Sequence, residues 1–198
     1  MTIDTPIGKL TLHASNGALT HVCFEGEEMP SSGKAKFPSK LEGWRRGFPE
    51  MTGCVEHYYL NKDELPHTQP RYSLGTPLAK RGILESVLEI AATQLTEYFA
   101  GTRKTFDIPI DPPGTPFQKK IWAEMTANVK FGETTTYGEL ATLTGNPKAS
   151  RAVGMANGRN PIPIIIPCHR VIGKGGKLTG FRWGLDVKVK LLEHEREK

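Results

Sequence analysis

The sequence has no long apolar run and few cysteines, and both absences exclude classes of protein. No stretch of about 18 apolar residues occurs, and the most apolar candidate, 161–167, contains three prolines, so a membrane-spanning helix is excluded. The three cysteines, Cys23, Cys54 and Cys168, form no C-x-x-C pair and no even disulfide set. This pattern is typical of a reducing compartment and excludes a disulfide scaffold.

The N-terminus also lacks the basic stretch and apolar core of a secretory signal, so we expect an intracellular protein. With 37% hydrophobic and 24% charged residues, the composition is that of an ordinary globular chain. The charge is uneven, because residues 1–108 hold 12 Lys and Arg against 13 Asp and Glu, whereas residues 109–198 hold 14 against 8. A basic C-terminal half indicates a polyanionic partner, and nucleic acid is the first to consider.

The N-terminal half has the pattern of a small α/β domain. Alternating apolar residues over 3–14 and 18–24, separated by a Ser-Asn-Gly turn, predict a β-hairpin. Apolar residues over 83–99 recur at intervals of three and four, which predicts an amphipathic helix closed by Gly101. The stretch 26–53 shows no period and is expected to be irregular, with a further strand at 55–60.

The C-terminal half is expected to be mainly helical. Four prolines in 108–116 predict an extended linker, and we place the domain boundary there, between 1–107 and 108–198. Thr115 can cap a helix that begins at Pro116, and Thr136 can cap a second helix.

That second helix is expected over 137–143, and Gly145-Asn146-Pro147 separates it from a third, 148–157. Helix, glycine-containing turn and helix form the helix-turn-helix pattern. The fold class expected is therefore an α/β N-terminal domain with a small β-sheet, followed by a mainly helical C-terminal domain that carries a winged-type helix-turn-helix.

Cys168 is the candidate nucleophile. It directly follows the apolar, proline-bracketed segment 161–167, which reads as a strand, and it precedes His169 and Arg170. A buried core cysteine is the alternative, because free cysteines are among the most buried residue types. An adjacent imidazole and guanidinium, however, are the groups that lower the pKa of a thiol and raise its thiolate fraction.

The residues around Cys168 resemble the O6-alkylguanine-DNA alkyltransferase family. The resemblance rests first on Pro167-Cys168-His169-Arg170-Val171, Gly158-Arg159-Asn160-Pro161 and Arg151-Ala152-Val153-Gly154. It continues through 116–118, 132–137, 145–147 and 191–195, and so covers essentially residues 108–198. The N-terminal half resembles the family only weakly, through Thr5-Pro6-Ile7-Gly8.

The resemblance implies direct-reversal DNA repair, in which the alkyl group of O6-alkylguanine, or O4-alkylthymine, moves irreversibly to Cys168. His169 is implied to relay the thiol proton through a water, and Glu195 to orient the imidazole, in the logic of nucleophile, base and orienter. Glu193 stays open as the alternative carboxylate, because a small shift of the alignment would select it. Asn160 is implied to brace the turn that carries the cysteine.

The resemblance also implies a base pocket formed by Tyr137, Val171, Arg182 and Trp183. The Tyr137 hydroxyl would donate to the guanine ring as the ring gains charge, and the backbone amide of Arg182 would donate to the O6 atom. Trp183 stands where some family members have glycine. Its indole is therefore expected to narrow the pocket rim and to crowd a benzyl group more than a methyl group. The alternatives are that the indole points outward or stacks on the benzyl ring.

The implied partner is double-stranded DNA that contains alkylated guanine, bound through the minor groove. The target nucleotide has to leave the base stack, and Arg151 is implied to fill the gap. The small residues Ala149, Ser150 and Gly154 would let the helix lie close to the sugars, with Lys148 beside them. We expect a monomer without cofactor, metal or membrane contact, nuclear in a eukaryote and cytoplasmic in a prokaryote.

Two other functions stay open from the sequence. A cysteine hydrolase could use Cys168 and His169, although catalytic partners of such enzymes usually come from separate parts of the chain. A DNA-damage recognition module without chemistry is the second alternative. The non-catalytic relatives of the family lack the reactive cysteine, which this chain retains.

Overall fold

The computed structural model describes residues 1–27 and 79–198, except for the side chains of 79–85. The strand expected at 55–60 and nearly all of the irregular stretch 26–53 lie outside these residues. Within the described ranges, no helix combines the length and apolar character needed to cross a membrane.

The N-terminal strands form an antiparallel sheet in the order β1-β2-β3. They span Thr2–Thr5, Gly8–Ser15 and Ala18–Phe24, respectively. Strands β2 and β3 are the expected hairpin. The sequence predicts one strand over 3–14, but the structure divides it into β1 and β2. A turn after Thr5 reverses the chain, so that Thr5 pairs with Gly8.

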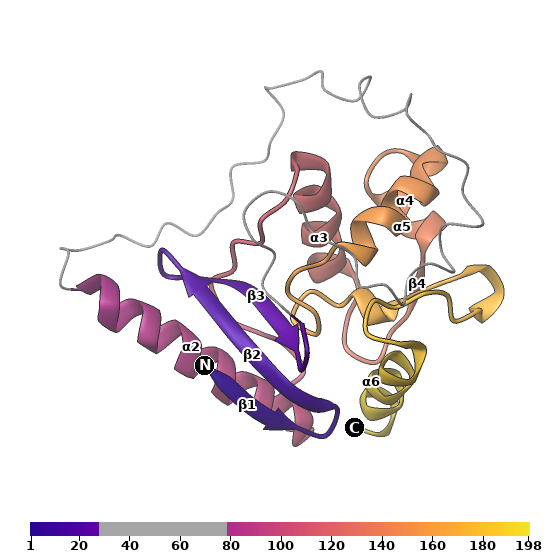
Figure 1. The fold of residues 1–198 in the computed structure, drawn as a ribbon. Helices are drawn as coiled ribbons and strands as arrows, with labels where there is room; N and C mark the ends of the chain where they lie inside the picture. Colours follow the sequence, from indigo (N-terminus) through magenta and orange to yellow (C-terminus); the bar gives the residue numbers. More distant parts are fainter. Residues whose placement is uncertain (28–78) are drawn as a thin grey trace. The chain divides into compact units, whose positions relative to one another are not determined.

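Helix α2, Ala79–Phe99, packs along β2 and β3 (Figure 1). Its buried residues Val87, Ala91, Leu95 and Tyr98 recur at helical spacing and belong to the main hydrophobic core. The helix closes at Gly101, whose φ of 77° suits a glycine. The expected helix is therefore confirmed, with its start at Ala79 rather than residue 83.

The proline-rich segment 108–116 is extended, but its first residues are not a free linker. Ile110 forms a bridge to Leu19 of β3. The Leu19 N–H donates to the Pro109 carbonyl at 2.8 Å, and the Asp111 N–H donates to the Leu19 carbonyl at 2.9 Å. This segment therefore forms hydrogen bonds with the backbone at the edge of β3. With an isolated linker, those backbone groups of β3 would have to bond to water instead.

Four α-helices lie in the C-terminal part: α3 (Pro116–Asn128), α4 (Tyr137–Leu143), α5 (Ser150–Gly158) and α6 (Leu185–Glu197). Thr115 and Thr136 cap α3 and α4 as expected, each in a reciprocal capping box.

The third expected helix begins later than the sequence indicated. Residues Pro147–Ala149 form a 3-10 turn, η3, and α5 starts at Ser150. The Asn146 side chain accepts from the Lys148 N–H at 3.2 Å, and Pro147 has no N–H to donate. This local pairing tightens the turn before α5.

The segment 161–167 is a turn, so the expected strand before Cys168 is wrong. The Ile166 N–H donates to the Ile162 carbonyl at 2.9 Å, and Ile164 has a φ of 74°. Such a φ is rare for a β-branched residue. A short apolar run does not distinguish a strand from a buried turn, and prolines remove the donors that a strand needs.

The turn leads into the 3-10 helix η4, Cys168–Arg170, and the short strand β5, Val171–Ile172. Strand β5 pairs in parallel with β4, Thr135–Thr136, directly before α4. A third 3-10 element, η5, spans Lys174–Gly176. The reactive motif is thus held between a tight turn and a two-stranded ladder.

Candidate active site

Cys168 is fully enclosed by polar partners and apolar neighbours. The residue is 1% exposed, its N–H donates to the Ile166 carbonyl at 2.8 Å, and its carbonyl accepts from Asn157 Nδ2 at 3.3 Å. Burial raises the pKa of the thiol to about 11, while the Asn160 side chain and the Lys188 charge act in the opposite direction. The thiol pKa is therefore raised overall, contrary to the expected lowering, and of His169 and Arg170 only the His169 backbone acts to lower it.

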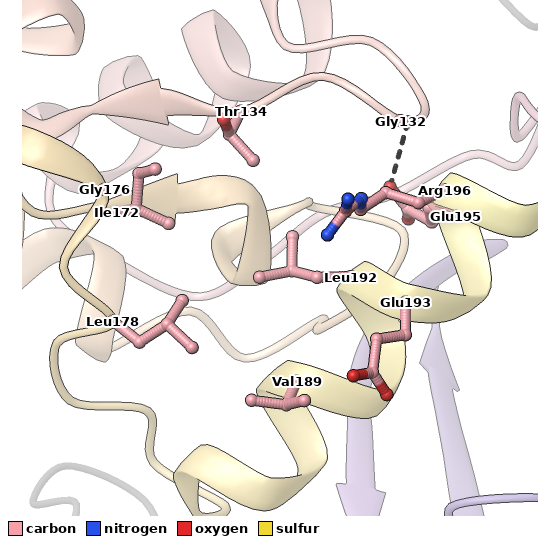
Figure 2. Close-up of a pocket in the computed structure, with 10 residues that line it drawn as sticks. All are labelled: Gly132, Thr134, Ile172, Gly176, Leu178, Val189, Leu192, Glu193, Glu195 and Arg196. Atoms are coloured by element: carbon pink, nitrogen blue, oxygen red, sulfur yellow. Dashed lines mark hydrogen bonds between the residues drawn. The ribbon is translucent and has the colours of Figure 1, made fainter.

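Glu195 is the centre of a buried hydrogen-bond network (Figure 2 shows its position on α6). Its Oε1 accepts from Tyr98 at 2.7 Å and lies 2.8 Å from His169 Nε2. Its Oε2 accepts from Arg170 Nε at 2.8 Å and from the Gly132 N–H at 3.2 Å. Burial alone would raise the pKa of Glu195, but the bonds and charges of His169 and Arg170 hold it well below its usual range.

The position of Glu195 decides between the two carboxylates that the sequence left open. Glu195 is buried against His169, whereas Glu193 lies two residues earlier on α6 and is exposed. Residues two apart on a helix face different directions. Only Glu195 can therefore pair with the imidazole in this arrangement.

His169 is completely buried, and its contact with Glu195 determines which ring nitrogen carries the proton. Because a carboxylate only accepts hydrogen bonds, the contact at 2.8 Å assigns the proton to Nε2 and leaves Nδ1 as an acceptor. Nδ1 has no hydrogen-bond partner among the described residues. Burial lowers the pKa of His169, although Glu195 acts to raise it, so the neutral imidazole is favoured.

The sequence reading missed Tyr98 and the true partner of Arg170. Tyr98 lies on α2, 97 positions before Glu195, and burial together with the Glu195 charge raises the pKa of its hydroxyl well above the usual range. Arg170 binds Glu195 through Nε and Nη2, and its Nη1 donates to the Val129 carbonyl at 2.7 Å. Its guanidinium therefore neutralises the carboxylate rather than the thiol.

Lys188 is a second residue that the sequence did not indicate. Its side chain is buried, and Nζ donates to the Val171 carbonyl at 2.7 Å and to the Thr179 carbonyl at 3.3 Å. Burial lowers its pKa to about 8, and the electrostatic coupling to Cys168 acts to raise it. A lysine on an amphipathic helix usually reads as solvent-exposed, so no sequence signal marked it.

Asn160 spans the turn before Cys168. Its Nδ2 donates to the Ile166 carbonyl at 2.8 Å, and its Oδ1 accepts from the Ile162 N–H at 2.9 Å. The residue is fully buried, so both bonds are shielded from water. This geometry ties the two ends of the turn that holds Ile164 in its left-handed conformation.

Two of the expected base-pocket residues adjoin Cys168. Val171 is buried at the start of β5, and its N–H donates to the Cys168 carbonyl. Tyr137 opens α4, its hydroxyl accepts from Thr179 Oγ1 at 3.3 Å, and burial raises its pKa. The Tyr137 ring also lies beside Gly154 of α5, where an added Cβ would be 3.6 Å from the ring.

The other two expected pocket residues, Arg182 and Trp183, make their contacts with the N-terminal strands. The Trp183 ring stacks on Phe24 of β3 with a centroid separation of 4.9 Å, and Nε1 donates to Glu27 Oε2 at 2.6 Å. Arg182 Nη2 lies 2.9 Å from Glu27 Oε1. The sequence did not indicate Glu27.

The expected DNA-contacting residues gather on η3 and the start of α5. Lys148 and Arg151 are exposed, and Ala149, Ser150 and Gly154 are partly buried. Val153 faces the core. One side of this segment therefore presents small side chains and two cations to solvent.

A pocket of about 480 Å³ lies beside the network, between α6 and the loop at Gly132 (Figure 2). Leu178, Val189 and Leu192 form its apolar side. A second pocket of about 610 Å³ is lined by Tyr137, Ser150 and residues of η5, among others. Cys168 lines neither of these two pockets. Within residues 1–27 and 79–198, no group of three or more His, Cys, Asp or Glu side chains is arranged to hold a metal ion.

The sequence matches two family models that cover nearly the whole chain. Residues 1–112 match the 6-O-methylguanine DNA methyltransferase, ribonuclease-like domain, and residues 116–197 match the DNA binding domain of the same family. The methylated-DNA–protein-cysteine methyltransferase of Mycolicibacterium paratuberculosis is 53% identical over 195 residues, covering 98% of this chain and 90% of that protein. The similarly named protein of Methanosarcina acetivorans is 57% identical over 111 residues, covering 56% of this chain and 70% of that protein.

Solved structures show the same relation. The crystal structure of the Mycobacterium tuberculosis O6-methylguanine methyltransferase is 35% identical and superposes with a TM-score of 0.66, covering 99% of this chain and 91% of that one. A crystal structure of the protein from the same organism in complex with DNA is also 35% identical, with a TM-score of 0.67 over 99% of this chain and 91% of that one.

Proposed function

The chain belongs to the O6-methylguanine DNA methyltransferase family, and from this membership and the geometry above we propose that Cys168 is the residue that accepts the alkyl group. The activity is alkyl transfer from methylated DNA to a protein cysteine, and it serves DNA repair. The proposal rests on the buried contact between His169 and Glu195. Cys168 directly precedes His169, and it is the only one of the three cysteines that lies in a motif of this family.

The network gives each residue a distinct part in the transfer. The neutral His169 takes the thiol proton at Nδ1 through a water, because Nε2 is already bound to Glu195. The Cys168 sulfur attacks the alkyl carbon, a C–S bond forms, and the bond from that carbon to O6 of guanine breaks. The electron pair goes to guanine, which takes up a proton, so the thiol proton is balanced by the one gained on the restored base.

Two features of the site affect the protonation state of Cys168: the burial of its thiol and the positive charge of Lys188. A pKa of about 11 keeps Cys168 protonated at neutral pH, so the resting site holds no uncompensated buried anion. Lys188 supplies a nearby positive charge, and we propose that it stabilises the thiolate. We assign Asn160 to holding the turn, Tyr137 to donating toward the leaving guanine, and Val171, Arg182 and Trp183 to the pocket walls.

DNA is the partner, and we propose that the chain recognises alkylated guanine in duplex DNA from the minor groove. Helices α4 and α5 would form a winged-type helix-turn-helix, and Arg151 would replace the extruded nucleotide in the stack. Small side chains at Ala149, Ser150 and Gly154 support a close approach to the sugars, with Lys148 beside a phosphate. We also propose the division into 1–107 and 108–198, action as a monomer, and an intracellular location with DNA.

The stoichiometry of the reaction tests this function. A fixed amount of protein is mixed with an increasing excess of an oligonucleotide that contains O6-methylguanine, and repaired guanine is counted. Because the C–S bond is not hydrolysed, we expect one guanine restored per chain and no further turnover. More than one per chain would contradict a suicide transfer, and Cys168→Ala should bind the DNA and restore none.

A further inference from the structure

Glu27 is held in a defined position by its own turn. Strand β3 ends at Phe24, and Gly26 reverses the chain with a φ of 83°. The Glu27 N–H donates to the Phe24 carbonyl at 3.0 Å, and Glu27 Oε2 accepts from the Phe24 N–H at 3.1 Å. The carboxylate is therefore oriented by local backbone contacts before any distant residue meets it.

Two consecutive residues of a distant loop converge on this carboxylate. The Trp183 indole N–H donates to Oε2 at 2.6 Å, and Arg182 Nη2 lies 2.9 Å from Oε1. The side chains of Arg182 and Glu27 are 19% and 16% exposed, so the ion pair is largely shielded from water. The bond from the indole to the carboxylate is charge-assisted, and such bonds are about twice as strong as neutral ones, whereas Arg182 contributes an ion pair without a hydrogen bond to Oε1.

Aromatic contacts hold the same loop from its other sides. Trp183 stacks on Phe24 and meets Phe181 edge to face, with centroids 5.0 Å apart. The Arg182 guanidinium lies 5.6 Å from the centroid of the Trp183 ring. Rotation of the indole would break the bond to Glu27 together with these contacts, so the loop has one favoured arrangement.

We propose that Glu27 is a positioning residue that fixes Arg182 and Trp183 and thereby sets the size of the alkyl group that reacts. This inference rests on the proposed function, in which both residues form the rim of the base pocket. A fixed indole leaves a bulky group no room to displace it, and a fixed Arg182 backbone keeps its amide aimed at O6. Without Glu27 the rim is free to move, which favours a benzyl group relative to a methyl group.

The test compares transfer from an O6-methylguanine oligonucleotide with transfer from O6-benzylguanine as the free base. Because a displacement of about 1 Å can cost about a hundredfold in rate, we expect Glu27→Ala to lower the methyl-to-benzyl ratio of rate constants about tenfold. The change should appear in the maximal rate of methyl transfer and not in the half-saturating DNA concentration. The residues proposed to bind DNA lie elsewhere, on η3 and α5.

Matched variants separate positioning from general destabilisation. Glu25→Ala removes the same charge from an exposed position two residues away and should leave the ratio unchanged. Glu27→Gln keeps an acceptor for the indole but loses the charge, so its ratio should lie between those of wild type and Glu27→Ala. Trp183→Phe keeps the aromatic stack and loses the donor, and its effect should not add to that of Glu27→Ala, because both remove one shared contact.

An unchanged or increased methyl-to-benzyl ratio in folded Glu27→Ala would overturn the proposal. Additive effects in a protein that combines Glu27→Ala with Trp183→Phe would overturn it as well. Should Glu27→Ala fail to fold, an unchanged ratio in Glu27→Gln would overturn it equally. Wild-type protein that transfers neither group to Cys168 would instead contradict the proposed function. The two failures are therefore distinguishable.

Discussion

Lys188 is a buried positive charge that acts to lower the pKa of the Cys168 thiol. Replacing it with methionine keeps most of the side-chain volume but removes the cation that opposes the burial of Cys168. Each unit by which the thiol pKa rises lowers the thiolate fraction at neutral pH tenfold. We expect Lys188→Met to slow alkyl transfer about tenfold or more.

The control for this variant is Lys190→Met, because Lys190 lies on the same helix and is exposed. Single-turnover rates with a methylated oligonucleotide measure the effect, and circular dichroism verifies the fold. A folded Lys188→Met protein that reacts as fast as Lys190→Met would show that the ammonium group does not assist the thiolate.

His169 links the stability of the fold to pH. Burial holds its pKa below the ordinary value of 6.5, so the unfolded chain binds a proton more readily than the folded one. The stability that it contributes is complete above pH 6.5 and is lost as the pH falls toward the lower folded value. The free energy of unfolding should therefore decrease between about pH 7 and pH 5.5, and less so in His169→Gln.

Urea denaturation at the two pH values measures this difference. His13 and His21 also have lowered pKa values, because of burial first, but they are present in both proteins and their effect cancels. Equal pH dependence in wild type and His169→Gln would show that the imidazole is not held neutral by the fold.

At the level of elements, we expect the turn over 161–167, which precedes Cys168, to contribute to the stability of the fold. Asn160→Ala leaves the buried Ile162 N–H without its acceptor and removes one of the two donors to the Ile166 carbonyl, which still accepts from the Cys168 N–H. One unsatisfied buried group costs about 1–3 kcal/mol, so we expect a loss of about 1–3 kcal/mol in the free energy of unfolding. The exposed Asn128→Ala variant is the control, and a loss below that of the control would show that the turn holds without Asn160.

The sequence predicted those elements whose ends are determined by nearby residues. The capping boxes at Thr115 and Thr136 and the glycine after α2 involve neighbours a few positions away, and these helix ends were located correctly. The turn at 161–167 was missed because it depends on the Asn160 side chain and on Ile164 accepting a strained φ. The spacing of apolar residues indicates neither the hydrogen bonds of Asn160 nor the φ of Ile164.

At the scale of the molecule, the active-site network joins residues from both halves of the sequence. The family motifs indicated Cys168, His169 and Asn160, but Tyr98 and Glu27 meet their partners only through the packing of distant segments, 97 and 156 positions apart in sequence. No local pattern records such contacts. Similarity over nearly the full chain then supplied the activity that geometry alone would have left open.

The basic C-terminal half leads to a prediction about duplex DNA. Arg151→Ala should slow repair of a duplex about tenfold or more, since extrusion of a base costs a few kcal/mol, and should leave reaction with free O6-benzylguanine unchanged. Arg196→Ala removes the same charge from α6 and is the control. Equal losses on both substrates would show that Arg151 does not assist extrusion.

The most direct measurement is intact mass followed by peptide mapping, after the protein reacts with an oligonucleotide that contains O6-methylguanine. Cys168 directly precedes His169, which pairs with Glu195, and Lys188 acts to lower its thiol pKa, whereas Cys23 lies in β3, where burial and Glu27 raise its thiol pKa. We expect the mass of each chain to rise by one methyl group, located on Cys168, and we expect no gain in Cys168→Ala. A methyl group on Cys23 or Cys54, or repair without any gain in protein mass, would contradict the assignment of Cys168 as the acceptor.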